Sequence, residues 1–85
     1  MQIIDLINKG SEYLRNSNIK SYQLDSEILL SNVLKKKREN LIVDYSKEVS
    51  QESIKNFREL IMRRSNNEPV AYILKTKEFW SKDFI

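Results

Sequence analysis

The scarcity of glycine and proline constrains the fold of this chain more than any other feature of its sequence. In 85 residues there is one glycine, Gly10, and one proline, Pro69. Folds rich in β-strands need many tight turns, and tight turns depend on these two residue types. A loop that cradles phosphate groups also needs several glycines, because backbone amides must approach the ligand closely. The sequence therefore favours a helical domain without a nucleotide-binding loop.

The composition also removes most of the side chains that carry catalysis. The chain has no cysteine and no histidine. The missing cysteines exclude disulfides and thiolate metal sites, and the missing histidines remove the commonest general base and neutral metal ligand. Asp25 and Glu27 do not share a helical face, so they offer no geometry for acid–base chemistry. We therefore expect no catalytic, cofactor-binding or metal site within these residues.

Length and hydropathy point to one small domain that stays out of the membrane. A chain of 85 residues makes one domain at most. Its start lacks the basic and apolar regions of a signal peptide. Its longest apolar run, Val70 to Leu74, is far shorter than the roughly 20 residues that span a bilayer. Together with the missing cysteines, these features favour a soluble cytoplasmic protein. The formal net charge of +3 is too small to indicate nucleic-acid binding by itself.

Apolar residues at helical spacing predict the first two helices. The first helix carries Ile3, Leu6, Ile7, Tyr13 and Leu14. Gly10 interrupts its buried side, which predicts either a second helix packed close to it or a bend. We expect Ser21 to cap the second helix, with Lys35 to Lys37 at its end. The inner stripe of the second helix is predicted to consist of Leu24, Ile28, Val33 and Leu34, with Leu30 beside them.

The second half of the chain predicts further helices. A short third helix that holds Leu41, Ile42 and Tyr45 is one interpretation of the next stretch, and irregular structure is the other. Ser50 is expected to cap the best-defined helix, which runs to about Arg64 and has an apolar stripe of Ile54, Phe57, Leu60 and Ile61. Pro69 suits the first turn of a final helix through Leu74. We therefore predict an all-α bundle of about five helices over residues 1–74.

Residues 75–85 differ from the helical part. They combine Phe79, Trp80 and Phe84 with a turn-like Ser-Lys-Asp, which is typical of a β-hairpin. A two-stranded hairpin is marginally stable alone. We therefore expect a short hairpin stub at the edge of a following domain, and we expect the three aromatic side chains to contact that domain.

Two clusters of basic residues have a functional and a structural interpretation. Lys35, Lys36, Lys37 and Arg38 could meet phosphates or an acidic protein surface. They could also form a solvated helix end, which is favoured because no aromatic residues interleave with them. For Arg63 and Arg64 a structural role is favoured: one of the two is expected to pair with a carboxylate such as Asp25 and so to tie two helices together.

A longer motif resembles a known family. The segment Arg63-Arg64-Ser65-Asn66-Asn67-Glu68-Pro69-Val70-Ala71-Tyr72-Ile73-Leu74, followed by Glu78-Phe79-Trp80 and Phe84, is similar to the end of the N-terminal domain in the HemK/PrmC family. These proteins are the glutamine methyltransferases of peptide-chain release factors. Leu24 to Leu30, followed by Val33-Leu34 and Arg38, looks like the second helix of that family. Lys75 and Ser81 stand where the family usually carries glycines, so the hairpin geometry stays open.

The resemblance implies a helical bundle followed by a Rossmann-like domain. That second domain would bind S-adenosylmethionine and methylate the glutamine of a release factor's Gly-Gly-Gln motif. The family's catalytic Asn-Pro-Pro-Tyr motif and its glycine-rich loop do not occur in this sequence, so no catalytic residue is carried over. The implied role of this bundle is to help hold the release factor. We take Lys35 to Arg38 as the candidate contact, because we expect their positive charge to be exposed.

Two other roles remain open at this point. The bundle could be a purely structural cap that is anchored to its own catalytic domain. It could also be a small nucleic-acid-binding module that uses Lys35 to Arg38 together with Arg63 and Arg64, which the modest net charge does not favour.

Overall fold

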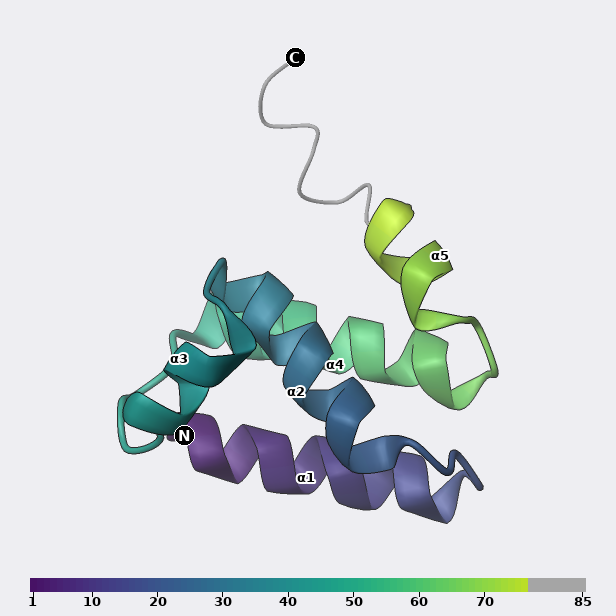
Figure 1. Cartoon of the computed structure of the whole chain (residues 1–85), viewed down its shortest axis with the longest axis horizontal. Helices are drawn as coiled ribbons and strands as arrows, with labels where there is room; N and C mark the ends of the chain where they lie inside the picture. The colour runs from purple at the N-terminus through teal and green to yellow at the C-terminus, as the bar shows by residue number, and fades with distance from the viewer. Residues whose placement is uncertain (77–85) are drawn as a thin grey trace.

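The computed structural model describes residues 1–76, which form five helices and no sheet (Figure 1). The helices are α1 (Ile3–Asn16), α2 (Tyr22–Leu34), α3 (Arg38–Val43), α4 (Gln51–Ser65) and α5 (Val70–Lys75). The predicted all-α bundle is confirmed for this part of the chain. The predicted β-hairpin, with Phe79, Trp80 and Phe84, lies outside the described residues.

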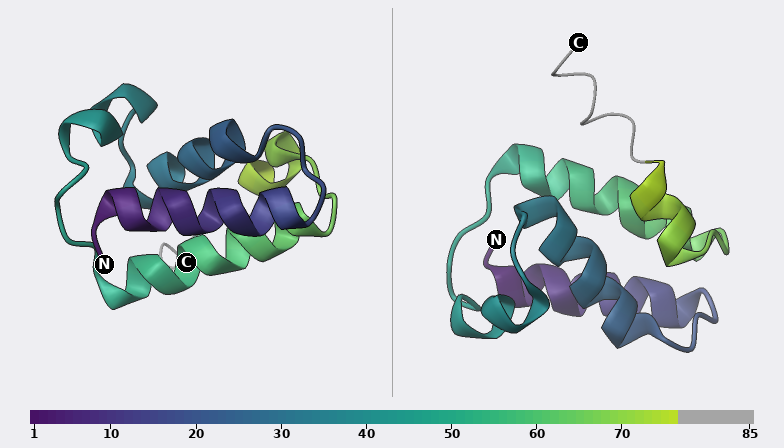
Figure 2. Two further views of the ribbon diagram at one scale, coloured as in Figure 1. Left: turned by 90° about the horizontal axis from the view of Figure 1, so that it is seen from below. Right: turned by 45° about the horizontal axis from the view of Figure 1, so that its top comes forward.

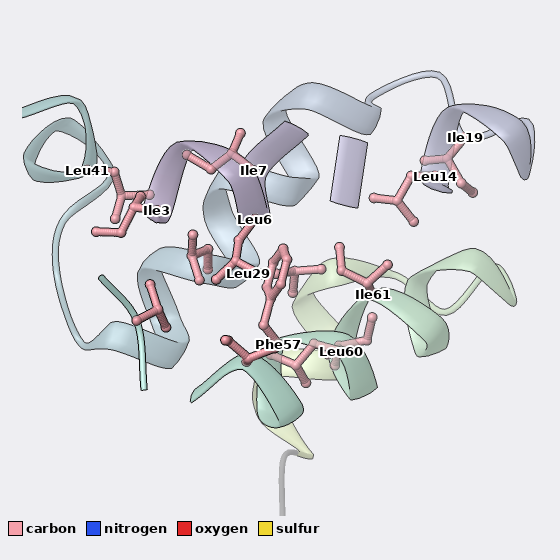
Figure 3. Close-up of a cluster of buried hydrophobic side chains, with 14 residues drawn as sticks. Ile3, Leu6, Ile7, Leu14, Ile19, Leu29, Leu41, Phe57, Leu60 and Ile61 are labelled. Carbon is pink, nitrogen blue, oxygen red and sulfur yellow. The ribbon is translucent and has the colours of Figure 1, made fainter. Parts of the chain in front are cut away.

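Helix α2 is the centre of the bundle, because it contacts each of the other four helices. Helices α1 and α4 also pack against each other and run side by side (Figure 2). The short helices lie at the periphery, with α3 against α2 and α5 against both α2 and α4. The core that they enclose contains Ile3, Leu6, Ile7 and Leu14 from α1, Leu29 and Leu30 from α2, and Phe57, Leu60 and Ile61 from α4 (Figure 3).

Gly10 lies where side chains of α2 and α4 pack directly against α1. A Cβ atom at this position would lie 2.6 Å from Oγ of Ser26 and 2.8 Å from Cζ of Phe57. These distances are far below van der Waals contact, so α2 and α4 approach α1 here only because residue 10 has no side chain. Of the two sequence alternatives for Gly10, the structure shows close approach of other helices.

Helix α4 follows the sequence prediction closely. Its N-cap is Ser50, whose Oγ accepts a hydrogen bond of 3.2 Å from the backbone amide of Ser53. All four residues of the predicted stripe are buried, namely Ile54, Phe57, Leu60 and Ile61. The helix continues through Ser65, one residue beyond the predicted end.

The buried face of helix α2 agrees only in part with the predicted stripe. Leu24 is 43% exposed and Ile28 is only partly buried, whereas Asp25, Ser26, Leu29 and Leu30 are buried. Leu30 is buried as predicted, and Val33 and Leu34 are partly buried against the core. The prediction was wrong for Leu24 and left out Asp25 and Ser26, because it assumed that only apolar side chains face inward. Ser26 is inside because its hydroxyl donates a hydrogen bond of 2.9 Å to the carbonyl oxygen of Ile7, and because its small size suits Gly10.

Candidate functional site

The described residues contain no metal site and no membrane-spanning helix. No group of three or more His, Cys, Asp or Glu side chains in residues 1–76 is placed to hold a metal ion. None of the helices in the same range is long and apolar enough to cross a membrane.

The buried carboxylate of Asp25 forms an ion pair with the partly buried Arg64. The Nε of Arg64 donates to Oδ2 of Asp25 at 2.8 Å, and the hydroxyl of Ser21 donates to the same oxygen at 2.8 Å. One further donor of Arg64, Nη1, reaches the carbonyl oxygen of Glu68 at 3.1 Å. Asp25 is 5% exposed, so donors of the protein rather than water molecules stabilise its carboxylate. The pair ties the start of α2 to the end of α4.

Arg63 points to different partners and stabilises the end of α5. Its Nη2 lies 2.8 Å from Oε1 of Glu68 and donates at 2.6 Å to Oγ1 of Thr76. Its guanidinium also lies over the ring of Tyr72, 6.0 Å from the centroid. One of the two arginines was expected to pair with a carboxylate such as Asp25, and in the structure this arginine is Arg64. Both arginines are engaged within the domain, which leaves few of their donors for an external phosphate.

The cationic segment Lys35 to Arg38 does not form one patch of unpaired charges. Lys36 Nζ lies 2.6 Å from Oδ2 of Asp44, and Arg38 Nε lies 3.0 Å from Oε1 of Glu27. Lys35 and Lys37 are exposed.

The three lysines were expected at the end of the second helix, but α2 ends at Leu34. Lys35 adopts a left-handed backbone conformation with φ of 58°, which stops the helix before them.

The ion pairs of Asp44 predict a dependence of stability on acid. The hydrogen bond from Lys36 lowers the pKa of Asp44 below its usual 3.8, with help from the charge of Lys47. The unfolded chain therefore binds a proton at a higher pH than the folded chain does. The stabilisation is complete above about pH 4 and is lost as the pH falls through the lowered pKa of the folded state.

We expect Asp44→Asn to remove this contribution. Urea unfolding at pH 6 and at pH 3 should show a smaller loss of stability on acidification for Asp44→Asn than for the wild type. The exposed Glu12 provides a matched control as Glu12→Gln. An acid response of Asp44→Asn equal to that of the wild type would contradict the assignment.

An apolar groove lies between α1 and α4, and the sequence analysis missed it. It has a volume of about 260 Å³, and its lining residues are Met1, Leu6, Lys9, Gly10, Tyr13, Phe57, Arg58, Ile61 and Met62. Tyr13 is 49% exposed and Met62 is 56% exposed, so large apolar side chains face solvent at the groove. Tyr13 was expected in the apolar stripe of the first helix, but in the structure it is exposed at the groove, whereas its neighbour Leu14 is buried.

Comparison with known proteins decides what kind of domain this is. A family model described as the PrmC N-terminal domain matches residues 5–74. This chain belongs to the PrmC N-terminal domain family. The match spans all five helices except the first two residues of α1 and the last residue of α5.

Individual relatives agree with this membership. A release factor glutamine methyltransferase of Leptospira interrogans is 37% identical over 82 residues, which are 96% of this chain and 29% of the relative. A release factor glutamine methyltransferase of Clostridium acetobutylicum is 38% identical over 99% of this chain and 30% of the relative. A bifunctional methyltransferase of Rickettsia felis is 37% identical over 98% of this chain and 16% of the relative. The chain thus spans less than a third of the length of these relatives. No solved structure matches it.

Proposed function

We propose that this chain is the substrate-docking domain of a release factor glutamine methyltransferase. In this proposal the domain holds a peptide-chain release factor while a separate catalytic domain methylates the glutamine of its Gly-Gly-Gln motif. The match of the PrmC N-terminal domain family to residues 5–74 carries the proposal. Relatives named release factor glutamine methyltransferase support it.

The described residues do not fit S-adenosylmethionine, the methyl donor that such an enzyme would use. Gly10, the only glycine of the chain, is buried at a helix crossing and cannot form a loop around the cofactor. The groove between α1 and α4 is lined by apolar and cationic residues, with no carboxylate to bind ribose hydroxyls. We therefore assign cofactor binding to the catalytic domain of the proposed enzyme and derive no step of the reaction here.

A docking role has a clear physical reason. A glutamine on a protein loop offers a methyltransferase little surface to bind. Contacts far from the reacting atoms supply binding energy that holds the loop in a reactive position. A small helical domain with exposed apolar side chains, such as Tyr13 and Met62, is suited to a transient contact that buries about 1,000 Å² or less.

Removal of the domain tests this function. We expect the full-length methyltransferase without residues 1–74 to show a KM for the unmodified release factor about tenfold higher or more, which corresponds to at least ~1.4 kcal/mol of binding. The KM for S-adenosylmethionine should stay unchanged, because the cofactor is bound elsewhere. Steady-state methylation measures both constants.

Two results would contradict the docking role. If deletion of residues 1–74 leaves the kinetics unchanged and lowers only the melting temperature, the domain is a structural cap. If the 85-residue chain binds RNA with a steep dependence on salt, it is a nucleic-acid-binding module.

A further inference from the structure

The groove between α1 and α4 has the shape of a site for protein side chains. Leu6 and Tyr13 are seven residues apart on α1, so the groove extends about 10 Å along the helix. Its volume of about 260 Å³ lies below the roughly 300 Å³ at which pockets for drug-sized ligands begin. This space suits one or two large side chains from two turns of a partner helix.

The charges at the groove have one sign. Lys9 on α1 and Arg58 on α4 are the charged residues that line it, and both are exposed. No carboxylate of residues 1–76 forms an ion pair with either side chain. Cations on both walls and apolar residues between them complement an apolar stripe with acidic residues on each side. A nucleic acid would pair with the two cations but would leave the apolar residues of the groove without a partner. A second copy of this chain would place its own Lys9 and Arg58 against the same two cations, and like charges repel.

We propose that the groove between α1 and α4 binds an amphipathic helix of the protein substrate, in which Asp and Glu residues border an apolar stripe. This inference rests on the proposed docking function and names the face that performs it. Lys9 and Arg58 pair with the acidic residues of the partner helix. Tyr13 and Met62 contact its apolar stripe, and the flexible Met62 side chain adapts to its shape.

The position of the groove leaves the rest of the bundle undisturbed. Helix α5 packs against α2 and α4, and none of its residues lines the groove. A partner helix in the groove therefore binds without displacing α5 or the arginine network around Thr76. The exposed Tyr13 and Met62 side chains can also be replaced without opening the core.

Variants of the full-length methyltransferase test the proposal. Lys9→Glu/Arg58→Glu is expected to raise the KM for the release factor about tenfold at low salt, with kcat unchanged and a smaller effect at high salt. Tyr13→Ser/Met62→Ser is expected to raise the KM about fivefold at any salt concentration. The matched control is Lys35→Glu/Lys37→Glu, which makes the same change in charge on exposed lysines and should change the KM less than twofold. Circular dichroism verifies that every variant is folded.

The outcomes separate this inference from the proposed function. If deletion of residues 1–74 raises the KM but both groove variants behave as the wild type, docking stands and the groove is the wrong face. If the deletion has no effect on the KM, the docking function itself fails. An equal rise of the KM in Lys35→Glu/Lys37→Glu overturns the inference, since overall charge would then be recognised.

Two other occupants of the groove would also overturn it. If the groove variants lower the melting temperature of the full-length enzyme without changing the KM, the groove binds the catalytic domain. If sedimentation shows a dimer of the 85-residue chain that Tyr13→Ser/Met62→Ser dissociates, it binds a second copy.

Discussion

Replacement of Arg64 with methionine is expected to destabilise the domain by about 3 to 5 kcal/mol. The variant leaves the carboxylate of Asp25 inside the bundle, with the hydroxyl of Ser21 as its remaining hydrogen-bond donor. A buried charge without its partner costs far more than the pair contributes, because water cannot reach it. For a domain of this size, such a loss lowers the Tm by more than about 12 °C.

Two further variants show whether the buried charge causes this loss. Asp25→Leu/Arg64→Met removes both charges together and should recover most of the lost stability, because no unpaired charge remains. Arg58→Met makes the same substitution at an exposed position of the same helix and should cost less than about 0.5 kcal/mol. Urea unfolding measures all three. A loss below about 1 kcal/mol in Arg64→Met would show that the Arg64–Asp25 pair does not hold α2 and α4 together.

Replacement of Gly10 with valine is expected to cost about 3 kcal/mol or more. Its Cβ would overlap Oγ of Ser26 and the ring of Phe57, and neither group can move away easily. Ser26 is held by its hydrogen bond to the carbonyl of Ile7, and Phe57 is 2% exposed in the core. The side chain added at position 10 therefore forces α1 away from α2 or α4.

The same substitution on the outer face of α1 is the control. Asn8→Val should change stability by less than about 0.5 kcal/mol, because residue 8 is exposed. Removal of the Ser26 hydroxyl should make Gly10→Ala less costly, so Ser26→Ala and Gly10→Ala should couple in a double-mutant cycle. If thermal unfolding of Gly10→Val matches that of the wild type, the helices do not meet at Gly10 as described.

The sequence predicted elements of the fold where local signals and burial agree. Ser50 has a side chain that caps a helix, and the residues after it repeat at helical spacing, so α4 was placed almost correctly. For α2 the sequence predicted the helix but only part of its buried face, because distant residues determine which polar side chains lie inside. Asp25 lies inside since Arg64, far along the chain, provides its counter-charge, and no local pattern reports such a partner.

The candidate sites also differ in how far the sequence could predict them. The position of Arg63 and Arg64 at a helix end indicated a structural role. The sequence analysis did not predict that Arg63 would bind Glu68 and Thr76. The groove could not be predicted, because Lys9 and Arg58 become neighbours only when α1 and α4 pack side by side. The lysines at 35 to 37 are conspicuous in the sequence, yet Lys36 already has a carboxylate partner in the fold.

The most direct test of the docking function is a titration of the ¹⁵N-labelled 85-residue chain with unmodified release factor, followed by NMR. We expect saturable changes in amide shifts, with the largest changes on α1 and α4 around Lys9, Tyr13, Arg58 and Met62. The segment 35–38 should change little. Spectra that stay unchanged up to millimolar release factor would contradict the claim that this domain docks the protein substrate.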